Sequence, residues 1–402
     1  MARRPASPKR LNAANLSGLG AERLGELLMQ AADADAILKR RLRLVMAAEA
    51  GPDLLALEID KRLTTIAASR ARVSWRKRPD LLRDLEILRA AIVKDLAEAA
   101  PAMGLERLVG WFDLFRGLAT RVKDQKGELA DAFETAASDL WRIAEAAVRT
   151  DDSTLGLLAD AVARQPLEYA RWIGAGGDDL TEDMARRLLD RLDTVSTARG
   201  MRTVVRRLAD RAGDLDLWLS MTTPEERGSP DFAAVMAKRL LVADRIPEAR
   251  QALEAALKPS ASNRRWTFGR SPQAGPPVLT PAWEATSIDL LEAEGRKDEA
   301  QNLRWAMFER DLSAPVLRAY LARLPDFDDV EALDRALAHA ATYADVETAL
   351  GFLMDWPAHR EAAALVERRI REVRASLPLK ADWAARLAQK YPGAAERLLA
   401  AP

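Results

Sequence analysis

The residue types best suited to chemistry gather in a basic segment from 61 to 78 that contains no Asp or Glu. Its cations and its single indole are Lys61, Arg62, Arg70, Arg72, Trp75, Arg76, Lys77 and Arg78. Guanidinium and ammonium groups neutralise phosphates, and an exposed indole stacks on a base. The segment therefore predicts a nucleic-acid contact, which the basic residues among the first ten positions would extend.

The same segment also fits a purely structural role. Glu58, Asp60, Asp80 and Asp84 lie close to it in sequence and would neutralise it by ion pairing, while Trp75 would pack among the helices. The whole chain has 61 Lys plus Arg against 61 Asp plus Glu, so no net charge draws it to nucleic acid. We favour the structural interpretation and keep nucleic-acid binding as the alternative.

A second candidate site lies between 259 and 281, where proline and glycine are too frequent for a helix. We predict a long loop there. It holds the aromatic and arginine types that are common at interaction hot spots, namely Arg264, Arg265, Trp266, Phe268 and Arg270. These residues either contact a partner or fill a seam between helices, and both interpretations stay open.

The remaining patterns favour structure over catalysis. His339 and His359 are the only histidines, and no metal-binding or nucleophile motif accompanies them. The glycine-rich turn at 174–177 is followed at once by acidic residues, which would repel a phosphate. The aspartates at 326–329 lack the spacing of a calcium loop, so 328–331 predicts a capping box. We predict a non-enzyme with no catalytic residue, metal or cofactor.

The elements that must position these residues are helices. Aromatic residues make up 5% of the chain, and β-branched residues seldom alternate with polar ones, so we predict an all-α fold with no significant β-sheet. The sequence has no cysteine, no secretory signal pattern and no uncharged apolar run of about 18 residues. We therefore expect a cytoplasmic protein with no membrane contact.

Breaks in the helical pattern suggest three parts. We expect a disordered basic tail at 1–19, a helical region at 20–150 and a repeat region at 151–402. In the helical region, a helix from about residue 34 directs Val45 and Met46 inward.

Prolines and apolar spacing place the next helices. Pro52 opens a helix that is supported by Leu54 and Leu57. Continuous helices are expected over 125–149 and 153–173.

Internal repetition predicts how the helices are arranged. The string at 240–249 resembles the one at 290–300, and weaker echoes occur at 208–218 and 337–350. Each echo consists of a helix end, a tight turn and the start of another helix. Because a helical hairpin cannot cover its own apolar face, we predict an α-solenoid of stacked antiparallel hairpins.

Capping residues mark several helix starts in the repeat region. Capping boxes are predicted at 179–182 and 223–226. Thr280 is predicted to cap a helix that starts at Pro281.

Several strings in the second half carry a family resemblance: Trp283-Glu-Ala, Leu291-Glu-Ala-Glu-Gly-Arg296, Leu324-Pro-Asp-Phe-Asp-Asp329 and Trp356-Pro357. In these strings the chain resembles a family of mainly alphaproteobacterial proteins known as a domain of unknown function. The resemblance covers nearly the whole chain and implies degenerate tetratricopeptide-like helical repeats. It implies no activity.

Two functions follow as hypotheses. The first is a non-catalytic scaffold that binds a protein partner through the concave face of a helical array and the 259–281 loop. The second is a nucleic-acid-associated protein that uses the 61–78 segment.

Overall fold

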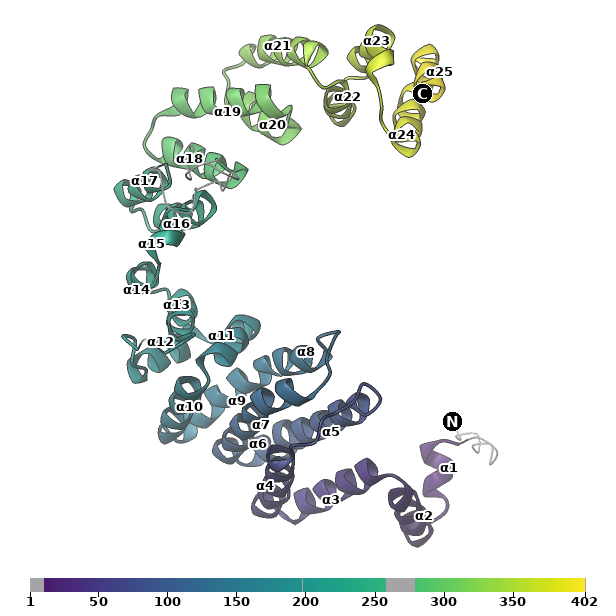
Figure 1. Cartoon of the computed structure of the whole chain (residues 1–402), viewed down its shortest axis with the longest axis vertical. Helices are drawn as coiled ribbons and strands as arrows, with labels where there is room; N and C mark the ends of the chain where they lie inside the picture. Colours follow the sequence, from purple (N-terminus) through teal and green to yellow (C-terminus); the bar gives the residue numbers. More distant parts are fainter. Residues whose placement is uncertain (1–10, 197, 258–278, 402) are drawn as a thin grey trace, which may run out of the picture. The chain divides into compact units, whose positions relative to one another are not determined.

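The fold consists of helices. The computed structural model describes residues 11–196, 198–257 and 279–401, and every regular element in these ranges is helical (Figure 1). The prediction of an all-α chain is confirmed. The chain divides into two compact units, Met1–Thr222 and Thr223–Pro402.

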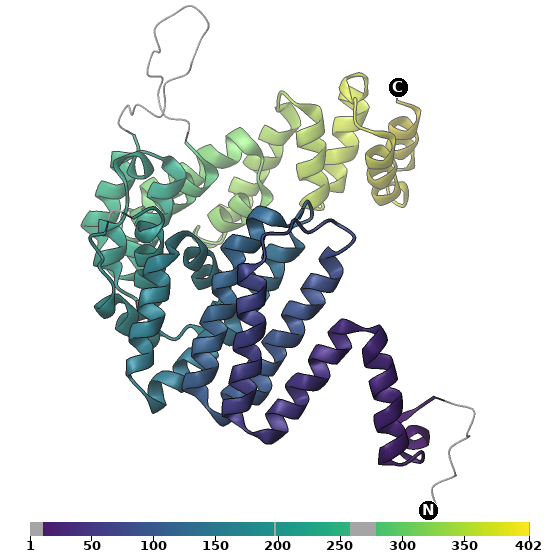
Figure 2. The ribbon, with the colours of Figure 1, turned by 60° about the horizontal axis from the view of Figure 1, so that its bottom comes forward.

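The first unit is built around one long helix, α7. The helices of this unit are α1 (Ala13–Ser17), α2 (Ala21–Ala34), α3 (Ala36–Ala50), α4 (Pro52–Ala68), α5 (Arg78–Ala90), a π-helical segment (Ala91–Leu96), α6 (Ala97–Ala99), α7 (Pro101–Arg121), α8 (Glu128–Thr135), α9 (Ala137–Thr150), α10 (Ser153–Arg164), α11 (Pro166–Ala175), a 3-10 turn (Gly177–Asp179), α12 (Glu182–Arg191), α13 (Met201–Ala212) and α14 (Leu215–Ser220). Figure 2 shows α4, α7 and α9 side by side. A continuous core extends from Leu44 to Ala212, so the boundary expected near residue 150 lies inside it.

Aromatic side chains fill the middle of this core. Trp111 stacks on Phe133 with ring centroids 4.1 Å apart, and Phe112 lies 4.5 Å from Trp172. The indole nitrogen of Trp111 donates to the Leu85 carbonyl at 3.1 Å, so its one polar atom is satisfied. These contacts join α5, α7, α8 and α11 into one packed body.

Several helix boundaries in the first unit differ from those predicted. The helix expected over 153–173 is two helices, because Pro166 cannot continue α10 and instead opens α11. The helix expected over 125–149 is also divided, into α8 and α9. Within the tail expected to lack order, Asn12 caps the short helix α1 by accepting from the Asn15 amide at 2.8 Å.

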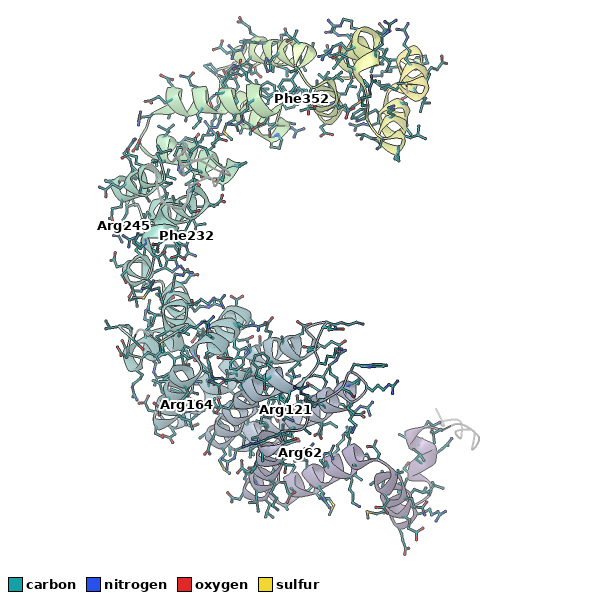
Figure 3. The ribbon with its side chains drawn as sticks, in the orientation of Figure 1. Arg62, Arg121, Arg164, Phe232, Arg245 and Phe352 are labelled. Atoms are coloured by element: carbon teal, nitrogen blue, oxygen red, sulfur yellow. The ribbon has the colours of Figure 1, made fainter. Side chains whose placement is uncertain are left out.

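The second unit consists of short helices. Its helices are α15 (Pro224–Arg227), α16 (Pro230–Val242), α17 (Ile246–Ala255), α18 (Pro281–Ala293), α19 (Lys297–Asp311), α20 (Ala314–Leu321), α21 (Asp328–Thr342), α22 (Val346–Asp355), α23 (His359–Arg369), a 3-10 turn (Ile370–Glu372), α24 (Leu377–Ala388) and α25 (Pro392–Ala400). Helix α16 contacts both α17 and α18, and α21 contacts both α22 and α23. Phe352, labelled in Figure 3, packs against Phe308 with ring centroids 5.3 Å apart.

The turns at 240–245 and 291–296 have the same geometry, as the repeated strings predict. The amide of Arg245 donates to the Leu240 carbonyl at 2.8 Å, and that of Arg296 donates to the Leu291 carbonyl at 2.9 Å. In each turn the preceding residue has a positive φ, +57° at Asp244 and +76° at Gly295. This is the Schellman arrangement, which ends one helix and redirects the chain.

The same turn occurs twice more. The amide of Asp214 donates to Ala209 at 2.9 Å, and that of Ala358 donates to Leu353 at 2.8 Å. The echo at 208–218 therefore has the predicted structure. The echo at 337–350 also has a helix end, a turn and a helix start, since α21 ends at Thr342 and α22 begins at Val346, but its turn lacks this hydrogen bond.

The predicted caps have mixed outcomes. Thr280 accepts from the Trp283 amide at 3.3 Å, and Thr223 forms a full capping box with Glu226, so both predictions are confirmed. The boxes at 179–182 and 328–331 are wrong. Thr181 caps α12 on its own, and α21 begins at Asp328 with no side-chain cap.

Candidate functional site

Two loops of the first unit form the surface that carries most of the predicted nucleic-acid contact. An isolated parallel bridge between Val73 and Val122 joins the α4–α5 loop to the α7–α8 loop. The Val73 amide donates to the Arg121 carbonyl at 2.9 Å, and the Lys123 amide donates to the Val73 carbonyl at 3.2 Å. Arg121, labelled in Figure 3, also donates from Nη2 to the Ile66 carbonyl at 2.7 Å. The two loops are therefore held side by side.

The cations of these loops point to solvent. Arg70, Arg72, Arg76 and Lys77 are exposed, as are Lys123 and Lys126 on the second loop, and none of the six forms an ion pair within the described ranges. We call them, together with Trp75, the basic loop surface. It has an excess of positive charge that its own acids do not neutralise.

Trp75 does not pack among the helices. Its side chain is 61% exposed, and the Arg76 guanidinium lies 5.1 Å from the ring centroid. The expectation that Trp75 fills the core is wrong, because it lies on the turn before α5 rather than on a helix face. An exposed indole beside a guanidinium is the arrangement on which a base or another flat group can stack.

The other cations of the 61–78 segment are held in ion pairs. Lys61 Nζ lies 2.5 Å from Glu58 Oε1, and Arg78 Nε lies 2.8 Å from Glu128 Oε2. Arg62 pairs with Asp84, a residue that is only 5% exposed. The segment is thus divided between a structural group and the basic loop surface.

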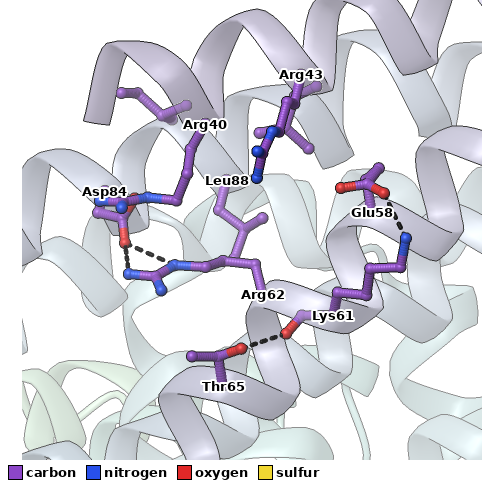
Figure 4. Close-up of a pocket in the computed structure, with 10 residues that line it drawn as sticks. Arg40, Arg43, Glu58, Lys61, Arg62, Thr65, Asp84 and Leu88 are labelled. Carbon is purple, nitrogen blue, oxygen red and sulfur yellow. Dashed lines mark hydrogen bonds and ion pairs between the residues drawn. The ribbon is translucent and has the colours of Figure 1, made fainter. Parts of the chain in front are cut away.

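Asp84 ties three helices together at the edge of a pocket (Figure 4). Its two carboxylate oxygens accept from Arg40 Nε of α3 at 2.8 Å and from Arg62 Nε of α4 at 2.9 Å. Arg43 also points from α3 toward this pocket and makes no ion pair with any described residue. We call this cavity between α3, α4 and α5 the Asp84 pocket.

The Asp84 pocket opens onto a groove that leads to the basic loop surface. Arg40 and Arg62 line both hollows, and Arg72 and Lys77 line the far part of the groove. Asp35 lies on the rim and caps α3, where the backbone N–H groups of the following residues hold its pKa below the usual value. The groove between the pocket and the loops is therefore lined by both cations and aspartates, with the cations in excess.

An apolar groove lies on the other side of the pocket. Met46, Leu54 and Leu57, together with two alanines of α3, line it, and Arg43, Lys61 and Glu58, which pairs with Lys61, lie toward one end. Met46 is 73% exposed and Leu57 is 50% exposed. The prediction that Met46 points inward is wrong, because periodicity shows which residues share a face and not whether a neighbour covers that face. We call this feature the α3–α4 groove.

The histidines lie apart and have structural contacts. His339 Nε2 lies 2.9 Å from the Glu309 carbonyl oxygen, and its ring packs against Phe308 and Tyr343. His359 begins α23. Among the residues that the structure describes, no cluster of three or more His, Asp or Glu side chains could hold a metal ion.

The glycine-rich turn is also structural. Gly176 lies against the Trp141 indole, so closely that a Cβ atom would overlap the ring. Gly177 has a φ of +53°, which favours glycine. Nearby, burial raises the pKa of the Tyr169 hydroxyl.

The hot-spot residues of the predicted long loop lie outside the described ranges. They are Arg264, Arg265, Trp266, Phe268 and Arg270.

Comparison with known proteins identifies the family. None of the curated proteins matches the chain. No helix in the described ranges has both the length and the apolar character that crossing a membrane requires. The model of the family described as Family of unknown function (DUF6880) matches residues 6–173 and 177–401, nearly the whole chain, and the protein belongs to this family.

Proposed function

We propose that the protein is a non-catalytic, cytoplasmic bacterial scaffold that is built on tetratricopeptide-like helical repeats and recognises a partner protein. The four Schellman turns support a repeating design. Ala209, Leu240, Leu291 and Leu353 accept the turn hydrogen bonds at successive intervals of 31, 51 and 62 residues, so the turns share their geometry and not a fixed period. Contacts of α16 with the next two helices fit a stacked array, in which each hairpin covers its neighbours.

The single observation that carries the proposal is the α3–α4 groove. Three large apolar side chains, Met46, Leu54 and Leu57, are exposed together along it. Scattered exposed apolar residues are ordinary, but a contiguous patch in a groove is typical of an interaction site. A partner that buries these side chains gains about 25 cal/mol for each Å² of apolar surface removed from water.

The groove fits an amphipathic helix of a partner protein with acidic residues near one end. Two consecutive helices, α3 and α4, form its walls, and a groove between helices can accept the apolar face of an amphipathic helix. Arg43, at the end of the groove, has no carboxylate partner in the described ranges. An acidic residue of the bound helix would complement it.

The test compares partner capture by three forms of the full chain. The Met46→Glu, Leu57→Glu double variant places negative charge in the groove, and Val242→Glu is the matched control at an 86% exposed site on α16. We expect an acidic amphipathic helical segment to bind the wild type and the control and to lose affinity for the double variant. Equal binding to all three forms, or no protein partner for any of them, would contradict the proposal.

The loop at 259–281 remains a predicted second contact. Replacing Trp266 and Phe268 by Ala distinguishes its two interpretations. Unchanged stability with weaker partner capture supports a contact, whereas a large fall in melting temperature supports a seam between helices.

Nucleic-acid binding is the second candidate, and the exposure of Trp75 favours it. Six cations without ion pairs in the described ranges share the basic loop surface with this indole. Binding of a single-stranded oligonucleotide should then weaken steeply with salt, with a slope of log K against log salt near −4 for about six phosphate contacts. Replacing Arg70, Arg72, Arg76 and Lys77 by Ala should abolish binding. The absence of binding by the wild type at low salt would eliminate this function.

A further inference from the structure

The Asp84 pocket is a cavity of about 230 Å³ with an excess of positive charge. Its charged lining consists of Arg40, Arg43, Lys61 and Arg62 against Glu58 and Asp84. Four cations face two carboxylates, so the lining carries a surplus of two positive charges. The pocket lies inside a chain whose net charge is zero, and the surplus is therefore local.

Asp84 accepts hydrogen bonds from only some of the N–H groups of Arg40 and Arg62. Arg40 bonds to it through Nε alone, so both terminal nitrogens of this guanidinium make no hydrogen bond within the described ranges. Arg62 bonds through Nε and Nη2, which leaves Nη1 without an acceptor there. A guanidinium has five N–H donors, so both groups are fixed in place with donors to spare.

Arg43 adds a cation that no carboxylate neutralises. Figure 4 shows its side chain extending from α3 toward the pocket, with no interaction drawn to another lining residue. Because Arg43 takes no part in the ion pairs of Asp84, the helix contacts do not require it. Arg43 is exposed, so its guanidinium is accessible to a ligand in the pocket.

We propose that the Asp84 pocket binds a small, doubly charged anion of the phosphate type. Guanidinium forks match the oxygens of phosphoryl groups. The volume lies below the range of about 300–1,000 Å³ that is usual for drug-sized ligands, so the occupant is small. Two negative charges would balance the surplus of the lining. The pocket adjoins the α3–α4 groove, but this proposal does not depend on a protein partner.

The test is calorimetric titration of the full chain at constant ionic strength with inorganic phosphate at pH 8, where this anion is mainly doubly charged. Wild type, Arg43→Gln and Arg41→Gln are compared. Arg41 is the matched control because it is exposed on the same helix, does not line the pocket and has no ion pair among the described residues. Both substitutions remove one positive charge from α3.

We expect saturable 1:1 binding that Arg43→Gln weakens roughly 10- to 100-fold, the value of one charge-assisted hydrogen bond, and that Arg41→Gln leaves unchanged. Equal weakening by the two variants would overturn the proposal, because it would indicate non-specific attraction. No saturable binding by the wild type would overturn it as well. Malonate, a carboxylate dianion, that bound as tightly as phosphate would overturn the assignment to phosphate-type anions.

Discussion

Replacing Asp84 by Asn should destabilise the first unit more than any change to an exposed carboxylate. Asp84 is 5% exposed and accepts hydrogen bonds from guanidiniums on two other helices, Arg40 on α3 and Arg62 on α4. The amide removes the negative charge and leaves both cations facing a neutral group. Helices α3, α4 and α5 thereby lose the ion pairs that join them.

The magnitude follows from burial. Removing one partner of a buried ion pair costs about 3–5 kcal/mol. The two arginine side chains are 30% and 27% exposed, so they regain part of their hydration, and we reduce the expected cost to about 2–3 kcal/mol. For a unit of this size the melting temperature should fall by about 4–12 °C.

The assay is urea unfolding followed by far-ultraviolet circular dichroism. Asp160→Asn is the matched control, because Asp160 is exposed on α10 and forms no ion pair within the described ranges. We expect the urea midpoint of Asp84→Asn to fall at an unchanged m value. The free energy of unfolding of the control should change by no more than about 0.5 kcal/mol. Equal midpoints for the two variants would refute the reasoning.

Three further predictions concern other positions. Gly176→Ala should cost about 1–3 kcal/mol in the free energy of unfolding, because the new methyl group overlaps the Trp141 ring; an unchanged urea midpoint would contradict this. Tyr169→Phe should leave the free energy of unfolding unchanged or raise it, because the buried hydroxyl has no hydrogen-bond partner in the structure; a loss above about 1 kcal/mol would show that the hydroxyl is bonded. The hydrogen bond from Arg250 is the main cause that lowers the pKa of Glu294. The ionised carboxylate therefore contributes fully to the free energy of unfolding above pH 4.5, and this contribution is lost as the pH falls through the lowered pKa. Unfolding curves of wild type and Glu294→Gln should therefore converge below pH 4.5, and a constant gap down to pH 3 would contradict the ion pair.

Local sequence signals predicted much of the fold. Pro52 and Thr280 correctly marked the starts of α4 and α18, because proline geometry and a side-chain cap act within one helical turn. The repeated strings correctly predicted that the turns before α17 and α19 share one geometry. The capping boxes predicted at 179–182 and 328–331 were wrong because other residues occupy the N-cap positions of α12 and α21. At α21, the positive φ of Phe327 places the helix start at Asp328, so this residue cannot act as the cap.

The candidate sites depend on contacts between residues that are far apart in the chain. Those contacts could not be predicted from the sequence. The 61–78 segment appeared as one basic stretch, yet Asp84 binds Arg62 and also Arg40, which is 44 residues away. The bridge between Val73 and Val122 brings Lys123 beside the α4–α5 loop, and no spacing rule connects those positions. Only tertiary packing decides which cations are neutralised.

The most direct test of partner recognition is site-specific photocrosslinking through the α3–α4 groove. A photoreactive residue replaces Leu57, with Val242 as the control position on α16, and mass spectrometry identifies the crosslinked peptide. The account predicts that Leu57 captures an acidic amphipathic helical segment of one partner and that Val242 does not. No adduct at Leu57, or the same adducts at both positions, would contradict it.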